Sequence, residues 1–111
     1  NHINKVSISD SLEKYIISIV NATRNPEIIG LKNESDYINY GASPRASINM
    51  NLASKAIAFF NQRDYVLPDD IKNIAVDVLN HRIILNYEAE ADGITTTQII
   101  NSILEKIEIN S

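Results

Sequence analysis

The stretch SPRASINMNLASKAIAFF, residues 43–60, decides the fold class because it joins a helix start signal to a helical pattern. Ser43 suits the N-cap and Pro44 the first helical position, where the missing N–H is not needed. Apolar residues then recur at intervals of three and four, which predicts a helix with one buried stripe. We expect that stripe to consist of Ile48, Leu52, Ala53, Ala56, Phe59 and Phe60.

Three further segments repeat this period, and the four together predict an all-α fold, a small helical bundle. The first begins at Asp10, which we interpret as its N-cap, and ends before Pro26. The next begins at Pro68 and ends near residues 80–82, and the last opens with a capping box at 95–98. Their expected inward positions are Leu12, Tyr15, Ile16, Ile19 and Val20; Ile71, Ile74, Ala75, Val78 and Leu79; and Ile99, Ile100, Ile103, Leu104 and Ile107.

The segments between these helices carry turn-forming residues and one β-rich run. Residues 25–43 are interrupted by a proline and two glycines, so we expect a connector with one turn of helix at 34–39. Residues 83–87 favour an extended chain, for which we expect a minor two-strand pairing with residues 65–66. The acidic run 88–93 is predicted to be a solvated turn.

Length and composition bound the class of protein. The 111 residues suffice for one domain, which we take as residues 1–111. Hydrophobic residues make up 44%, enough apolar surface to offset the entropy of ordering, so a disordered tail is excluded. The net charge of -4 disfavours nucleic-acid binding, and the lack of cysteine excludes disulfides and cysteine zinc sites. No apolar run approaches the roughly 20 residues that span a bilayer, so we expect a cytoplasmic protein without membrane insertion.

The sequence offers no complete catalytic or metal site. Its three glycines cannot make a phosphate loop of the G-x-x-x-x-G-K type. His81 has no second ligand at metal-binding spacing and is expected to stabilise a helix end, and Arg82 to pair with a nearby carboxylate or reach a neighbouring domain. The acidic run 88–93 resembles a calcium loop, yet the position that needs a bidentate glutamate holds Ile99. We therefore expect no catalytic residue and no metal ligand here.

Arg45 breaks a rule that the chain obeys elsewhere. It falls at the second position of the predicted helix, where the backbone dipole is already positive and a cation is disfavoured by about 0.3–1 kcal/mol. The helix at Pro68 follows the usual preference, with Asp69 and Asp70 in its first turn. A local choice of this kind, made without evident compensation, indicates a functional residue.

A guanidinium beside free N-terminal N–H groups suits a phosphate. Arg45 is therefore the candidate phosphate-binding residue, and Ser43 and Pro44 form the helix start that positions it. The alternative is a surface arginine that pairs with a carboxylate such as Glu34 or Asp36.

Three stretches in order resemble the MoxR family of AAA+ ATPases. They are GASPRA at 41–46, DYVLPDDI at 64–71, and HRIIL followed by YEAEADGIT between 81 and 95. The resemblance covers most of the chain, from residue 10 to about 103. One departure is Leu67, which stands where the family usually has Thr or Ser, so the helix after it is expected to lack a hydroxyl cap.

The resemblance implies the small helical lid of a longer ATPase, and the first residue, Asn1 rather than Met, also suggests a fragment. In the family, the arginine of the SPRA stretch, here Arg45, is the second sensor, which contacts the terminal phosphates of ATP. The fragment alone would hydrolyse nothing and bind no cofactor, whereas the parent protein would use ATP and Mg. The implied partners are the AAA+ core of the same chain, neighbouring subunits of a ring, and proteins with von Willebrand factor A domains. The implied activity is chaperone-like remodelling or maturation of protein complexes.

Two other interpretations stay open at this point. A stand-alone helical interaction module would bind a protein partner and no nucleotide. A helix-turn-helix DNA binder is disfavoured by the acidic charge and by the lack of a basic recognition helix. A phosphate loop elsewhere in the full sequence would separate the lid from the interaction module.

Overall fold

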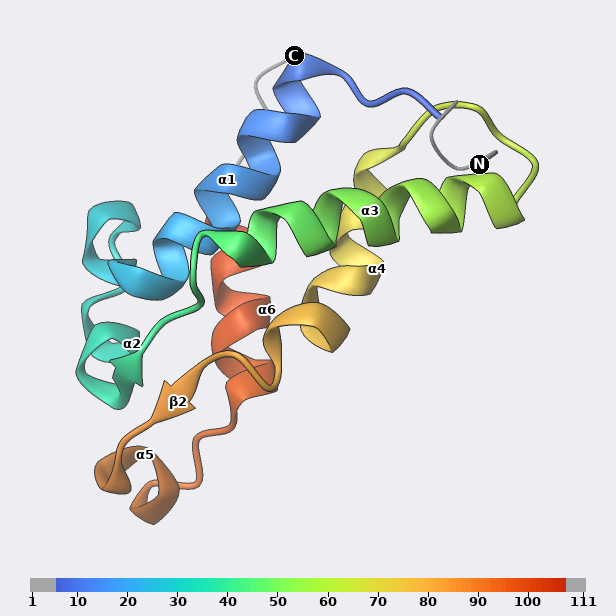
Figure 1. Cartoon of the computed structure of the whole chain (residues 1–111). Coiled ribbons are helices and arrows are strands. Elements are labelled where there is room, and N and C mark those ends of the chain that lie inside the picture. The colour runs from blue at the N-terminus through green and yellow to red at the C-terminus, as the bar shows by residue number, and fades with distance from the viewer. Residues whose placement is uncertain (1–5, 108–111) are drawn as a thin grey trace.

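The computed structural model of the chain describes residues 6–107, apart from the side chain of Asn33. The elements are α1 (Asp10–Arg24), the 3-10 helix η2 (Pro26–Ile29), α2 (Lys32–Tyr37), β1 (Ile38–Tyr40), α3 (Arg45–Phe60), α4 (Pro68–Leu79), β2 (Ile84–Leu85), α5 (Tyr87–Ala91) and α6 (Thr96–Lys106). The predicted all-α class is confirmed. The four expected helices are α1, α3, α4 and α6, and shorter elements lie between them (Figure 1).

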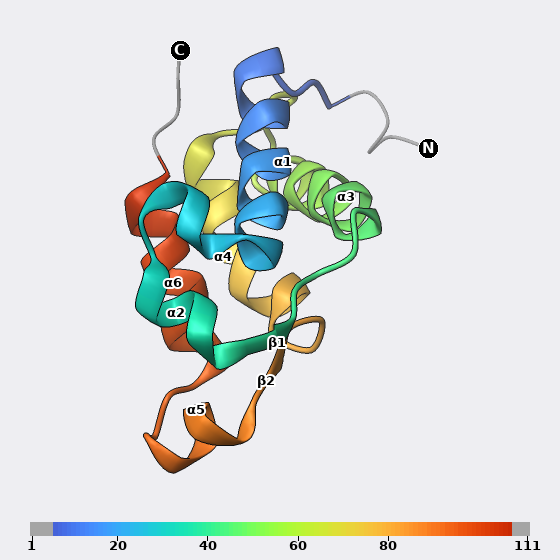
Figure 2. The ribbon, with the colours of Figure 1, turned by 90° about the vertical axis from the view of Figure 1, so that its left-hand side faces the viewer.

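The four long helices enclose one core. α3 packs on α4 and α1, and α6 packs on the same two helices. Figure 1 shows α3 running across the molecule, and Figure 2 shows it from its end beside α1. Within the described residues, no helix is both long and apolar enough to cross a membrane. The largest fully buried apolar side chains are Ile16, Ile19, Val20, Met50, Ile71, Leu79, Ile99, Ile100 and Ile103.

The boundaries of α1 and α6 follow from their caps. Ser9 caps α1, because its Oγ accepts a hydrogen bond from the N–H of Leu12 at 3.2 Å; the prediction of Asp10 as the cap was wrong by one residue. α6 begins as predicted. Thr95 Oγ1 accepts from the N–H of Gln98 at 3.2 Å, and the Gln98 side chain accepts from the N–H of Thr95 at 2.9 Å.

α4 begins at a partly buried ion pair that the sequence analysis missed. Leu67 supplies no hydroxyl, as expected, but the carboxylate of Asp70 accepts from the N–H of Leu67 at 2.8 Å. The guanidinium of Arg63 donates to both oxygens of Asp70, at 2.7 and 2.8 Å. Asp70 is only 3% exposed. The hydrogen bonds from Arg63 and then from Leu67 hold the pKa of Asp70 below its usual value.

The short sheet pairs two segments far apart in sequence. β1 and β2 are antiparallel, with Ile38 opposite Leu85 and Tyr40 opposite Ile84. The prediction that residues 83–87 are extended is confirmed in part, but the expected partner, residues 65–66, was wrong.

Residues 65–66 instead contact the beginning of the described chain. Ser7 donates its N–H to the carbonyl of Asp64 at 2.8 Å, and Val66 donates its N–H to the carbonyl of Ser7 at 2.9 Å. The Tyr65 carbonyl accepts a further hydrogen bond from Arg63 at 3.0 Å, so the backbone of residues 64–66 has partners other than β2.

Two connecting segments are more ordered than their composition suggests. The connector at 25–43 holds η2, α2 and β1, and the expected turn of helix at 34–39 is α2. The acidic run 88–93 is not simply a solvated turn, because α5 forms there. Asn86 caps α5 by accepting from the N–H of Ala89 at 2.9 Å, and Tyr37 donates its hydroxyl to Asp92 at 2.7 Å.

α3 buries a different side from the one that the sequence predicts. Its buried residues are Ala46, Met50, Ser54 and Ala58, whereas Ile48, Leu52, Phe59 and Phe60 are exposed. The small side chains on the buried side let the backbones of neighbouring helices approach closely. The helix therefore has two apolar sides, and periodicity alone does not tell which one the domain covers.

Candidate functional site

The loop that leads into α3 is pressed against the end of α1. A Cβ atom built on Gly41 would lie 2.3 Å from the carbonyl oxygen of Thr23, closer than any real contact. Only glycine permits this approach without a shift of one backbone against the other. The glycine of the GASPRA stretch is thus explained by packing.

A buried hydrogen bond fixes the next residue. Thr23 Oγ1 accepts from the N–H of Ala42 at 2.9 Å and donates to the carbonyl of Val20 at 2.6 Å. The side chains of Thr23 and Ala42 are both inaccessible to solvent. Residues 41–42 are therefore held to α1 immediately before the candidate site.

Ser43 and Pro44 start α3 largely as predicted. Ser43 Oγ accepts from the N–H of Arg45 at 3.1 Å, and the Ser43 carbonyl accepts from the N–H of Ala46 at 2.9 Å. Pro44 has helical dihedral angles, although the regular helix begins one residue later, at Arg45. By its hydrogen bonds Ser43 acts as the N-cap, which leaves Arg45 at the second helical position.

The Arg45 side chain is exposed at this helix start. Among residues 6–107 it makes no ion pair and no side-chain hydrogen bond; the ion pair that the structure gives joins Arg63 to Asp70. The alternative partners considered from the sequence, Glu34 and Asp36, form no ion pair with it. The guanidinium is therefore open to a ligand from outside the domain.

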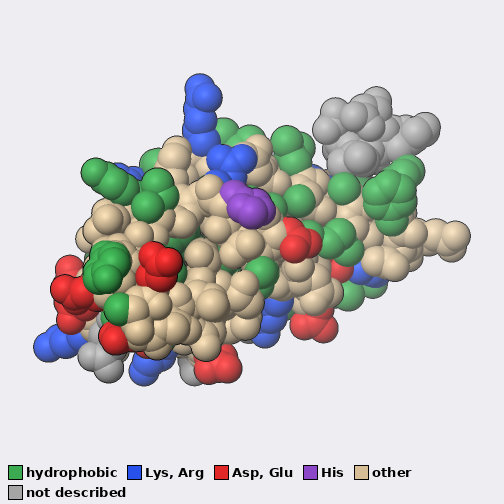
Figure 3. Space-filling view, turned by 90° about the horizontal axis from the view of Figure 1, so that it is seen from below, with side chains coloured by type: hydrophobic (Ala, Val, Ile, Leu, Met, Phe, Trp, Pro, Cys, Tyr) green, Lys and Arg blue, Asp and Glu red, His purple; other side chains and the backbone are tan. Residues whose placement is uncertain are grey.

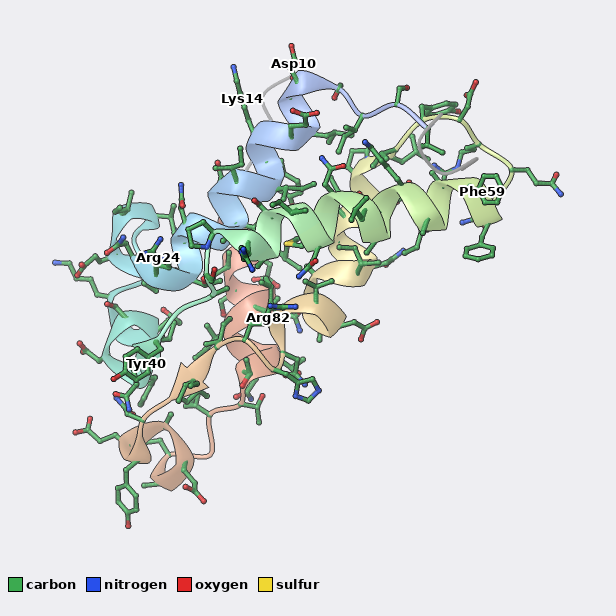
Figure 4. All side chains as sticks on the ribbon, viewed as in Figure 1. Asp10, Lys14, Arg24, Tyr40, Phe59 and Arg82 are labelled. Atoms are coloured by element: carbon green, nitrogen blue, oxygen red, sulfur yellow. The ribbon has the colours of Figure 1, made fainter. Side chains whose placement is uncertain are left out.

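A second arginine faces the same space. An open hollow of about 430 Å³ is lined by Arg45, Ile48, Asn49 and Arg82. Figure 4 shows Arg82 beside the first half of α3, although the two lie far apart in sequence. Arg82 is exposed and, within the described part of the chain, makes no side-chain hydrogen bond or ion pair; the expected pairing with a nearby carboxylate is not found.

The hollow carries positive charge in a molecule whose net charge is -4. None of its four lining residues is acidic. Figure 3 shows basic side chains gathered beside a histidine on the face seen from below. Such a hollow can bind an anion through charge-assisted hydrogen bonds.

An apolar groove lies between α1 and α3, next to the hollow. Its lining includes Ile17, Ile48 and Leu52, which are 50%, 61% and 50% exposed, and its volume is about 220 Å³. Ile48 lines both the groove and the hollow. We call Ile17, Ile48 and Leu52 the apolar stripe.

The described residues supply no metal site. Residues 6–107 hold no group of three His, Asp or Glu side chains placed to bind one ion.

Comparison with known proteins places the chain in a family. The model of the AAA lid domain family matches residues 31–103, more than half of the chain. The chain belongs to the AAA lid domain family. The matched residues of this lid include the loop at 41–43, Arg45, Arg82 and both strands.

Relatives of the lid carry the name that the sequence motifs suggest. It is 37% identical over 102 residues to "Chaperone MoxR1" of Mycobacterium tuberculosis, across 92% of this chain and 27% of that protein. It is 32% identical over 97 residues to "Protein MoxR" of Paracoccus denitrificans, across 82% of this chain and 29% of that protein. The resemblance to the MoxR family is thereby confirmed.

A solved structure matches the whole lid. It is the crystal structure of a protein provisionally assigned as an ATPase from Cytophaga hutchinsonii, which is 66% identical, with a TM-score of 0.98, over 100% of this chain and 34% of that one. The chain thus spans about a third or less of the length of the relatives it matches.

Proposed function

We propose that residues 1–111 are the lid of a longer MoxR-type AAA+ ATPase, and that Arg45 is the second-sensor arginine that contacts the nucleotide phosphates. The observation that carries this proposal is the exposed, unpaired Arg45 at a helix start that α1 holds in place. The match to the AAA lid domain family supports the same assignment.

Arg45 would couple the lid to the state of the nucleotide. A guanidinium makes stronger hydrogen bonds to a terminal phosphate than to water, so ATP favours the lid orientation that allows this contact. Loss of the terminal phosphate weakens the contact and releases the lid. The lid itself contributes no catalytic residue, and ATP with Mg is held mainly by the rest of the protein.

The apolar stripe supports docking of the lid on another protein domain. Three large aliphatic side chains beside the cationic hollow are the expected rim of a contact with the AAA+ core, either in the same chain or in a neighbouring subunit of a ring. On this proposal the intact cytoplasmic protein performs chaperone-like remodelling or maturation of protein complexes, and proteins with von Willebrand factor A domains are candidate partners.

Substitution of Arg45 tests this function. Arg45→Ala in the intact protein is expected to lower ATP turnover about 100-fold, the scale of losing a side chain that positions the reacting group. The melting temperature of the 111-residue chain should stay the same or rise slightly, because an unfavourable contact with the helix dipole is lost.

Arg24→Ala is the matched control, since Arg24 is an exposed arginine at the C-terminal end of α1 and does not line the hollow. Equal turnover of Arg45→Ala and wild type would remove the sensing role. A clear fall in melting temperature would show that Arg45 is structural.

The second candidate function is a stand-alone interaction module, which the exposed apolar stripe favours. It predicts that the intact protein binds no nucleotide. Titration of the intact protein with ATP therefore separates the two candidates before any variant is made.

A further inference from the structure

The small sheet holds Arg82 next to Arg45. Tyr40, in β1, is paired with Ile84, in β2. Arg45 follows Tyr40 by five residues, and Arg82 precedes Ile84 by two. The strand pairing therefore holds the segment that leads to Arg45 beside the segment that contains Arg82.

Arg82 is held on its other side as well. Its backbone N–H donates to the carbonyl of Leu79, the last residue of α4, at 2.9 Å, and its neighbour Ile83 is only 5% exposed. The backbone of Arg82 is thus anchored to the core while its side chain stays exposed, so its position beside α3 is part of the fold.

The arrangement of charge indicates an anionic ligand. Two guanidinium groups that share one hollow repel each other, and no acidic residue lines the hollow to offset the repulsion. A multiply charged anion between them would convert this repulsion into attraction. Arginine suits such a ligand because its planar donors form paired hydrogen bonds to phosphate oxygens.

We propose that Arg82 is a second phosphate-binding residue, and that Arg45 and Arg82 close from two sides on the terminal phosphates of a bound nucleoside triphosphate. This assignment rests on the proposed function of Arg45. It differs from that function in giving the lid a two-arginine site, which recognises the number of negative charges on the nucleotide.

Binding measurements on the intact protein test the assignment. The variants are Arg82→Gln, Arg82→Lys, Arg45→Gln, the double variant, and Arg24→Gln as the exposed control. The ligands are a slowly hydrolysed ATP analogue and ADP. Arg82→Gln should weaken the analogue about tenfold, the scale of one charge-assisted hydrogen bond, and ADP much less. Arg82→Lys should recover part of the loss, because it keeps the charge without the paired donors.

A shared ligand also predicts coupling. The double variant should lose less affinity than the product of the two single losses, since each arginine grips the phosphate better when the other is present. Arg24→Gln should bind both nucleotides like the wild type. The melting temperature of each variant verifies folding. If Arg82→Gln is unstable, the affinities of Arg82→Lys for the two nucleotides test the assignment instead.

The possible failures are distinguishable. Selectivity here is the ratio of the affinities for the ATP analogue and ADP. If Arg45→Gln lowers this ratio and both Arg82 variants keep it, the phosphate-binding role of Arg82 is wrong and the proposed function stands. If no variant changes selectivity, both are wrong. If Arg82→Gln weakens the analogue and ADP equally without coupling to Arg45, then Arg82 pairs with a carboxylate of another domain and the assignment is overturned.

Discussion

Gly41 shows how a single missing side chain places the candidate site. Its backbone lies against Thr23 so closely that a Cβ has no room, and the neighbouring Ala42 donates to the same threonine. The contact sits four residues before Arg45. A shift of this loop would therefore move the guanidinium out of register with whatever it binds.

We predict that Gly41→Ala destabilises the chain by about 1–3 kcal/mol, the cost of overpacking, and lowers ATP turnover of the intact protein at temperatures where it remains folded. Thermal melting and turnover assays measure the two effects. Gly93→Ala is the control, because Gly93 has a positive φ of 73° but open space around it. Gly93→Ala should lower the stability without lowering turnover. An equal loss of turnover in both variants would contradict the role of Gly41 in positioning Arg45.

At the residue level, the sequence predicts Arg45 but not its neighbour in the hollow. Arg45 stands out because the helix dipole makes a cation at that position locally unfavourable, and this signal needs no knowledge of the fold. Arg82 carries no comparable local signal. Its meaning depends on the pairing of β1 with β2, a long-range contact that periodicity cannot reveal.

At the scale of the elements, the first turn of α4 depends on one carboxylate. Asp70 binds both Arg63 and the backbone of Leu67 while almost fully buried. Because its pKa is lower in the folded chain than the ordinary 3.8, the folded state favours the ionised form. The stabilisation is present above that ordinary value and is lost as the pH falls through the folded pKa.

Asp70→Asn is predicted to lower the free energy of unfolding at pH 7 by about 1.5–3 kcal/mol, the range for hydrogen bonds to charged groups. The difference between the variant and the wild type should shrink as the pH drops below about 4. Urea unfolding at several pH values between 3 and 7 measures this. A difference that stays constant over that range would show that ionisation of Asp70 contributes nothing to stability.

The elements differ in how well the sequence predicts them, for physical reasons. In α1, α4 and α6 the residues predicted from the 3.6-residue period are buried, apart from Val78, Leu104 and Ile107, which are half-buried against the core. α3 has a second apolar face that the domain leaves open, and the larger side chains on it misled the prediction. The strand partner was missed because β1 and β2 are more than 40 residues apart in sequence, and local patterns do not indicate which distant segments pair.

At the scale of the whole molecule, the apolar stripe is the part of the surface that the domain does not explain. Leu52 is half exposed, so Leu52→Lys should change the stability of the 111-residue chain by no more than about 0.5 kcal/mol. If the stripe docks on the AAA+ core as proposed, the same charge is buried in the intact protein. We expect turnover to fall at least about tenfold, equivalent to ~1.4 kcal/mol.

Asn73→Lys provides the control, because Asn73 is exposed on α4 and lies outside the groove between α1 and α3. It adds the same charge to the same fold and should leave turnover unchanged. Full turnover in the Leu52→Lys protein would show that the stripe faces solvent in the working enzyme.

The two backbone hydrogen bonds that join Ser7 to residues 64–66 bear on how the lid could move. They attach Ser7, which precedes α1, to residues that follow the last turn of α3, whereas Arg45 lies in the first turn of α3. Sixteen residues of helix measure about 24 Å, so a tilt of the whole lid, α1 included, by roughly 10° about this end would move the guanidinium by about 4 Å. That displacement exceeds the length of a hydrogen bond, so on the proposed function a small rotation of the lid as one body is enough to form or lose the contact between Arg45 and a phosphate.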